Sequence, residues 1–110
     1  MRAILVLCAA AVLAPGVSFA QGASAEQGQK VYMAQKCSVC HSVAGQGNKN
    51  GALDEVGSKL SADDIRQWIV DAPGMTAKSK STRKPPMKSY SLAKDEVDAL
   101  VAYMLSLKKK

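Results

Sequence analysis

The chain has 110 residues, a length that allows one domain. It carries 15 Lys and Arg against 9 Asp and Glu, a net charge of +6, and three cysteines. Three cysteines are too few for a disulfide-dense scaffold. An integral membrane protein is also excluded if the N-terminal segment is cleaved, because a bilayer span needs roughly 20 apolar residues.

The first twenty residues have the pattern of a secretory signal peptide. Arg2 supplies a short positive region, Ala3–Leu13 is an unbroken apolar run, and Ser18-Phe19-Ala20 is a small-x-small cleavage site. We therefore expect cleavage after Ala20 and a mature domain formed by residues 21–110. Loss of Arg2 lowers the net charge to +5.

The mature chain would have a thin core. It keeps 36 apolar residues among 90, and its four aromatic residues are Tyr32, Trp68, Tyr90 and Tyr103. Chains of this size usually need a covalent or cofactor staple. The two cysteines that remain allow at most one disulfide, so a cofactor is the better candidate.

Helical patterns begin soon after the cleavage site. Ser24 and Gln27 form a capping box, which predicts a helix over Ala25–Lys36. The stretch Cys37–Leu60 is punctuated by glycines and is predicted as a loop. Ser61, followed by two acidic residues, predicts the start of a second helix.

The second half of the chain is predicted to hold a long loop and a last helix. Pro73-Gly74 is expected to end the second helix, and Ala72–Ser91 is predicted to be unstructured. A third helix is predicted over Lys94–Leu107 from its 3.6-residue apolar period, with a weak cap at Ala93. We see no strand pattern or repeat, so the predicted class is all-α with three main helices.

Cys37-Ser38-Val39-Cys40-His41 is the motif that carries chemistry. C-x-x-C-H is the attachment motif of c-type haem. The two thiols add across the two vinyl groups of haem, and the adjoining His41 then lies under the iron as its proximal ligand. The motif predicts one covalent haem c anchored by Cys37 and Cys40. Export supports it, since this haem is attached outside the bacterial cytoplasm, and we expect a periplasmic location.

Three other interpretations of these residues are weaker. A structural zinc site needs four ligands, and the mature chain offers two cysteines and one histidine. A thioredoxin-like dithiol needs a βαβ setting, which the sequence lacks. A plain disulfide remains open in an exported protein, but it would not explain His41.

The mature chain resembles a small bacterial class I c-type cytochrome over essentially its whole length. Besides the haem motif, the resemblance is carried by Gly28-x-x-x-Tyr32, by the ending Glu96–Tyr103 and by Pro85-Pro86-Met87. It implies a bundle of helices wrapped around one haem, in which the last helix crosses the first where Gly28 meets Tyr103. It also implies that Met87 is the sixth iron ligand.

The methionine assignment has a rival in Met75, which follows Pro73-Gly74 and is expected on a loop. Met87 is preferred because Pro85-Pro86 holds the preceding backbone extended. Met104 is expected in the core and Met33 in packing or at the surface. A sixth site that is empty or filled otherwise stays open.

One departure from the family concerns the residue that holds His41. The family often has Gly-Pro and then Leu after the motif, and the proline carbonyl accepts a hydrogen bond from the proximal histidine. Here the sequence is Gly51-Ala52-Leu53. A carbonyl remains, but the rigid φ of proline is lost.

Further residues are candidates for haem packing and docking. The resemblance suggests haem contact for Trp68, and Tyr90 either covers the haem edge or faces solvent. Five basic residues fall within eleven positions and are expected to steer an acidic redox partner: Lys78, Lys80, Arg83, Lys84 and Lys88. Nucleic-acid binding does not suit an exported protein.

Together these features predict a non-enzymatic, monomeric, periplasmic one-electron carrier with His/Met ligation. Two alternatives stay open. In the first alternative, the chain is the cytochrome subunit of a periplasmic dehydrogenase or oxidase complex. In the second, it is a ligand-binding or peroxidatic haem protein with a labile sixth site.

Overall fold

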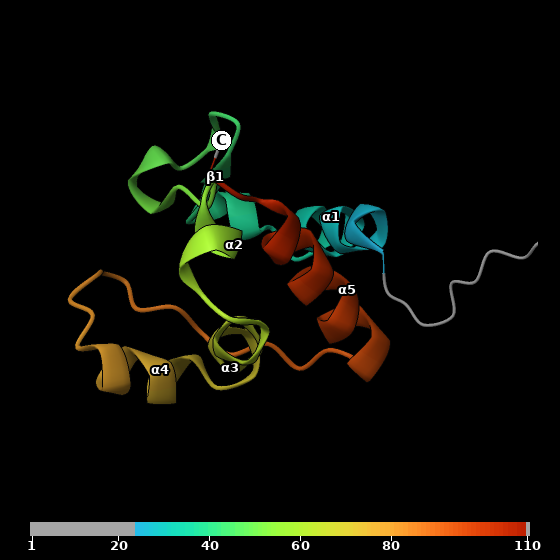
Figure 1. Ribbon diagram of the computed structural model, residues 1–110. Coiled ribbons are helices and arrows are strands. Elements are labelled where there is room, and N and C mark those ends of the chain that lie inside the picture. The colour runs from blue at the N-terminus through green and yellow to red at the C-terminus, as the bar shows by residue number, and fades with distance from the viewer. Residues whose placement is uncertain (1–23, 110) are drawn as a thin grey trace, which may run out of the picture.

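The computed structural model describes residues 24–109 (Figure 1). The predicted signal peptide and its cleavage point lie outside the described residues. Within the described part are helices α1 (Ala25–Ala34), α2 (Val56–Lys59), α3 (Ala62–Val70), α4 (Ala72–Ser79) and α5 (Lys94–Ser106). Short 3-10 helices η1 (Cys37–Val39) and η2 (Lys49–Gly51) flank an antiparallel pair of strands, β1 (Ser42–Val43) and β2 (Gln46–Gly47). The expected mostly helical architecture is confirmed.

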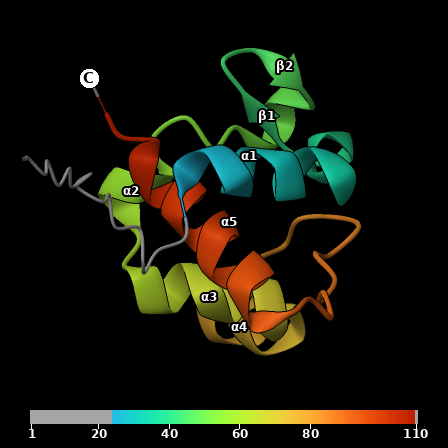
Figure 2. The same cartoon turned by 90° about the vertical axis from the view of Figure 1, so that its right-hand side faces the viewer.

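The first and last helices cross each other, as expected (Figure 2). Gly28 of α1 is buried against α5, where a side chain would collide with the carbonyl of Ala99. The rings of Tyr32 and Tyr103 meet edge-on beside it, with their centroids 5.7 Å apart. A missing side chain therefore allows the close approach of the two helices.

The core lies between α1, α3 and α5. Its buried residues are Tyr32, Ile65, Ile69, Val97, Leu100, Val101, Tyr103 and Met104. Met104 is 6 % exposed, in line with its expected place in the core, whereas Met33 is 63 % exposed. No helix within residues 24–109 is long and apolar enough to cross a membrane.

The predicted helix starts are confirmed by their caps. The Ser24 hydroxyl accepts from the Gln27 amide at 3.0 Å, and the Ser61 hydroxyl accepts from the Asp64 amide at 3.1 Å. Ala93 has no side-chain acceptor, but the Glu96 carboxylate accepts from the Ala93 amide at 3.1 Å, which is half of a capping box. The first helix ends two residues earlier than predicted, because Lys36 turns the backbone to a left-handed φ of 58°.

The prediction that Ala72–Ser91 is unstructured is wrong for its first eight residues, Ala72–Ser79. Pro73-Gly74 does not end α3, which stops at Val70, but lies in the first turn of α4. Proline is favoured there because its missing N–H would be unpaired anyway. The Asp71 carboxylate caps α4 by accepting from the Gly74 amide at 3.2 Å. Met75 consequently lies on a helix and not on a loop.

The prediction that the chain contains no strands is also wrong. β1 and β2 have two residues each, which is too short to show a period-2 pattern. They are joined by Ala44 and Gly45, both with positive φ, a conformation that suits a tight hairpin turn.

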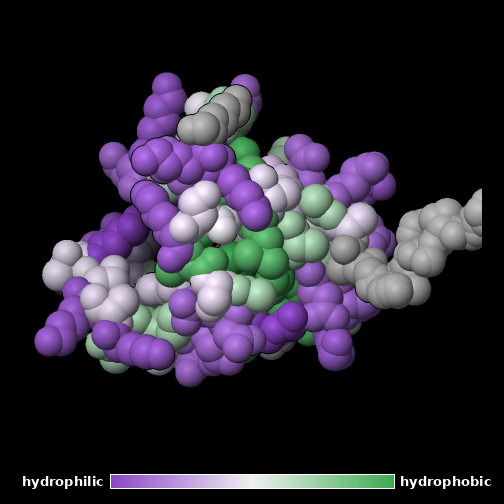
Figure 3. All heavy atoms as spheres, in the orientation of Figure 1, coloured by the Kyte–Doolittle hydropathy of each residue, from purple (hydrophilic) through white to green (hydrophobic). Residues whose placement is uncertain are grey.

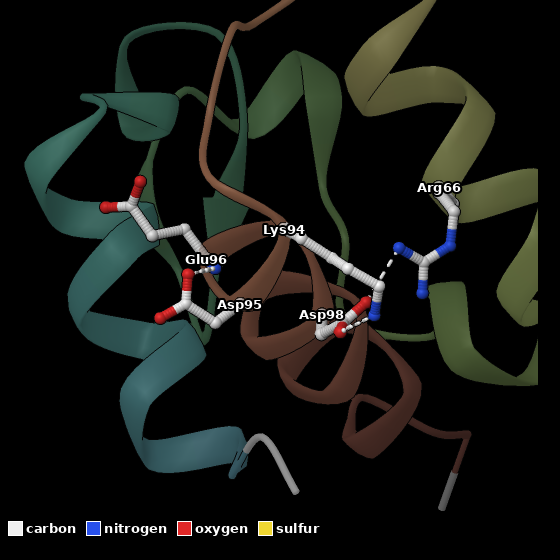
Figure 4. A network of polar contacts seen from close by, with 5 residues as sticks. All are labelled: Arg66, Lys94, Asp95, Glu96 and Asp98. Atoms are coloured by element: carbon white, nitrogen blue, oxygen red, sulfur yellow. Dashed lines mark hydrogen bonds and ion pairs between the residues drawn. The ribbon is translucent and has the colours of Figure 1, made fainter.

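An ion-pair group holds α3 to α5 on the surface (Figure 4). The Asp98 carboxylate lies 2.8 Å from the guanidinium of Arg66 on α3 and 2.8 Å from the ammonium of Lys94 one turn away. The hydrogen bond from Lys94, and to a smaller extent the one from Arg66, holds the pKa of Asp98 below its usual value.

Candidate functional site

The C-x-x-C-H motif begins where α1 ends. The left-handed Lys36 redirects the chain, and Cys37–Val39 then forms η1. The thiols of Cys37 and Cys40 are both free and half-buried. Burial raises the pKa of the Cys37 thiol, an effect that the Lys88 ammonium opposes.

Every carbonyl of the five-residue motif has a hydrogen-bond partner. That of Cys37 accepts from the amides of Cys40 (3.1 Å) and His41 (2.9 Å). Asn48 serves three more: its amide donates to Ser38 at 3.1 Å and to His41 at 2.9 Å, and its side chain donates to Val39 at 3.2 Å. The fifth carbonyl, that of Cys40, accepts from the Arg83 guanidinium.

Sequence reasoning missed the structural role of Asn48. Its side-chain oxygen also accepts from the Asn50 amide at 2.9 Å, an Asx turn that starts η2. The only hint in the sequence is an Asn directly after a Gly, a pattern common to many turns. Arg83 was grouped with the basic residues expected to dock a partner, but it is half-buried and bonded to the motif.

His41 is oriented by a backbone carbonyl, one residue earlier than the resemblance implied. Its Nδ1 lies 2.9 Å from the carbonyl oxygen of Gly51, the residue before Ala52, which stands where the family often has proline. The departure from proline therefore does not remove the acceptor. A hydrogen bond donated by Nδ1 leaves the Nε2 lone pair free for a metal. Burial lowers the pKa of His41, and the nearby Arg83 charge lowers it too, while the bond to Gly51 acts against both.

The other predicted site residues lie on the α4–α5 loop and on α3. Met87 is half-buried between exposed Pro86 and Lys88. Tyr90 is half-buried and packs against the core; burial raises its pKa, as do the neighbouring thiols of Cys37 and Cys40. The Lys88 ammonium lies 5.2 Å from the centroid of the Tyr90 ring. This loop therefore passes beside the two thiols.

Trp68 lies half-buried on α3 and, among the described residues, is not one of the side chains packed against the core. No hydrogen bond within residues 24–109 joins its indole to the C-x-x-C-H motif. Its suggested haem contact stays a prediction.

The residues present fit a covalent haem. The donor set consists of two half-buried free thiols and one imidazole whose Nε2 is unengaged. Partly buried apolar side chains pack against the core, among them Cys37 of the motif itself and Leu53, Val56, Leu60, Tyr90 and Leu92. Figure 3 shows, in the view of Figure 1, apolar residues at the centre of the molecule's face with hydrophilic residues around them. Within residues 24–109, no group of three or more His, Cys, Asp and Glu side chains is placed to hold a metal ion.

Comparison with known proteins agrees with this geometry. The family model described as Cytochrome c matches residues 25–108, most of the chain. Neither the curated proteins nor the solved structures yielded a match. Because the family model covers helices α1 to α5 and the C-x-x-C-H motif, the chain belongs to the cytochrome c family, and its cofactor is covalently attached haem c.

Proposed function

We propose that this protein is a periplasmic one-electron carrier whose haem iron is bound by His41 and Met87. Members of the cytochrome c family carry haem c and for the most part transfer electrons without catalysing a reaction of their own. Residues 1–20 would be removed on export, which leaves residues 21–110 as the monohaem domain.

The observation that carries the proposal is the hydrogen bond between His41 and Gly51. At 2.9 Å it selects the tautomer with hydrogen on Nδ1 and directs Nε2 away from the acceptor. The lowered pKa of His41 favours the neutral imidazole, the form that binds a metal. Cys37 and Cys40, adjoining in the same loop, would hold the haem through thioethers.

Met87 would complete the ligand set from the loop between α4 and α5. Bound haem supplies a one-electron Fe(III)/Fe(II) couple, and a thioether ligand favours the reduced state. Tyr90, three residues later, lies beside the thiols and would cover the edge of the haem. An occupied sixth position disfavours the binding of oxygen or peroxide, which argues for electron transfer over a peroxidatic role.

Four exposed lysines on α4 and the following loop support a partner with an acidic docking face: Lys78, Lys80, Lys84 and Lys88. Such a surface steers encounter electrostatically, so the rate of electron exchange with the partner should fall as salt is added. A rate that is independent of salt would remove this support for the acidic partner.

An absorption spectrum of the protein, exported from a host that matures c-type haem, tests the proposal. We expect a reduced c-type spectrum and, in the oxidised protein, the weak far-red band of Fe(III)–sulfur bonding. A haem spectrum without that band, together with carbon monoxide binding at neutral pH, would favour the ligand-binding alternative. Purification as a stable complex with an oxidoreductase would favour the subunit alternative.

A further inference from the structure

We propose that Arg83 is a positioning residue of the haem site, which joins the loop that carries Met87 to the loop that carries Cys40 and His41. The inference rests on the proposed ligation of iron by His41 and Met87. It concerns what holds those two ligands in a fixed relation to each other.

The hydrogen bonds of the motif show why Arg83 is needed. Four of its five carbonyls are satisfied from within residues 37–48. The carbonyl of Cys40 is the exception, and its donor is the guanidinium of a residue 43 positions later. A charge-assisted hydrogen bond is about twice as strong as a neutral one, and the carbonyl it reaches belongs to the peptide unit that leads into His41.

The guanidinium also lies against Gly51, the residue whose carbonyl orients His41. A side chain on Gly51 would collide with both Arg83 and the Cys40 carbonyl. Because Gly51 has no side chain, it leaves room for the guanidinium of Arg83. Arg83 thus contacts the backbone at Cys40, which directly precedes His41, and at Gly51, whose carbonyl orients the His41 ring.

The loop around Met87 is anchored by hydrogen bonds on both sides. After Met87, the Tyr90 amide donates to the Ile69 carbonyl at 2.8 Å, and the Ser89 hydroxyl accepts from the Ala72 amide at 3.1 Å. Before Met87 the anchor is Arg83, since residues 84–88 make no hydrogen bond within the described part of the chain. Loss of Arg83 would leave Met87 held from one side only.

The experiment compares Arg83→Met and Arg83→Lys with Lys78→Met in the holoprotein. Lys78 is exposed on α4, so its replacement makes the same change in net charge without touching the motif. Added imidazole competes with Met87 for oxidised iron, and the loss of the far-red band reports the displacement. The reduction potential is recorded on the same samples.

We expect Arg83→Met to reduce the imidazole concentration at half-displacement by about ten-fold, the factor that one charge-assisted hydrogen bond is worth. Arg83→Lys should recover part of the loss, because it restores the charge and one donor but not the planar fork. Lys78→Met should match the unsubstituted protein in the imidazole titration and in the reduction potential, because neither measurement involves the docking partner. If Arg83→Met fails to mature, the comparison of Arg83→Lys with Lys78→Met decides.

Two results would overturn the inference, and they are distinguishable. If the unsubstituted protein has the band and the Arg83 variants titrate like Lys78→Met, Arg83 does not position the ligands while the proposed function stands. If the unsubstituted protein lacks the band, ligation by Met87 is wrong and the inference fails with it.

Discussion

Gly28 on α1 and Tyr103 on α5 lie so close that a Cβ on the glycine would stand 2.5 Å from the Cβ of the tyrosine. The same Cβ would also collide with the backbone of Ala99, which cannot move without shifting α5. This contact sets how α1 crosses α5. Because the haem motif starts three residues after α1 ends, it also sets where Cys37 lies relative to the rest of the core.

Gly28→Ala should therefore destabilise the protein. Overpacking of a tight contact costs about 1–3 kcal/mol, and here the obstacle is backbone and not a flexible side chain. Guanidinium unfolding of the holoprotein measures the change. Gln29→Ala, at an exposed position of the same helix, should stay within about 0.5 kcal/mol of the unsubstituted protein. Equal stability of the two variants would contradict the importance of the crossing.

Asn48→Ala should loosen the loop that holds the C-x-x-C-H motif. The variant loses the 3.2 Å bond to the Val39 carbonyl and the 2.9 Å Asx bond from the Asn50 amide, and we expect a loss of about 1–2 kcal/mol in unfolding free energy. Asn50→Ala is the matched control, since the Asn50 side chain makes no hydrogen bond within residues 24–109. The interpretation of Asn48 as the organiser of this loop is wrong if both substitutions have the same small effect.

Met87→Ala should lower the reduction potential by on the order of 0.1 V or more, within the roughly 0.8 V that axial ligands span. It should also abolish the far-red band and let the reduced protein bind carbon monoxide. Met75→Ala should do none of these, because Met75 lies on α4 and not on the loop that passes the thiols. Spectroelectrochemistry of both variants checks this, and the reverse pattern would assign the sixth ligand to Met75.

Asp98→Asn should change how stability depends on pH. A carboxyl whose pKa is lower in the folded chain stabilises it above its unfolded pKa, and this stabilisation fades as pH falls through the folded pKa. We expect the stability difference between the unsubstituted protein and Asp98→Asn to be constant above about pH 5 and to shrink below about pH 4.

Unfolding at a series of pH values measures that difference. In a background that carries Arg66→Met and Lys94→Met, the pKa of Asp98 loses the two hydrogen bonds that lower it, so the pH dependence should disappear. A pH dependence that survives in this background would show that the two ion pairs are not its cause.

The helix starts, the haem motif and the buried face of the last helix are determined by residues close together in the sequence. Two helix starts are specified by the caps Ser24 and Ser61, because a cap acts within one turn of the helix. The C-x-x-C-H motif likewise carries its chemistry within five residues. The apolar period predicted the last helix, and its buried face in the structure includes Val97, Leu100, Val101 and Met104.

Tertiary structure decided the features that depend on distant partners. Pro73 is compatible either with the end of one helix or with the first turn of the next, and the cap from Asp71 resolves this in favour of α4. The acceptor for His41 is the Gly51 carbonyl. The sequence alone does not distinguish this carbonyl from its neighbours, because every residue of the loop has a backbone oxygen. In the sequence, Arg83 is indistinguishable from the surface lysines around it. Its role depends on the fold, which brings the guanidinium to the carbonyl of Cys40, a group that needs a hydrogen-bond donor.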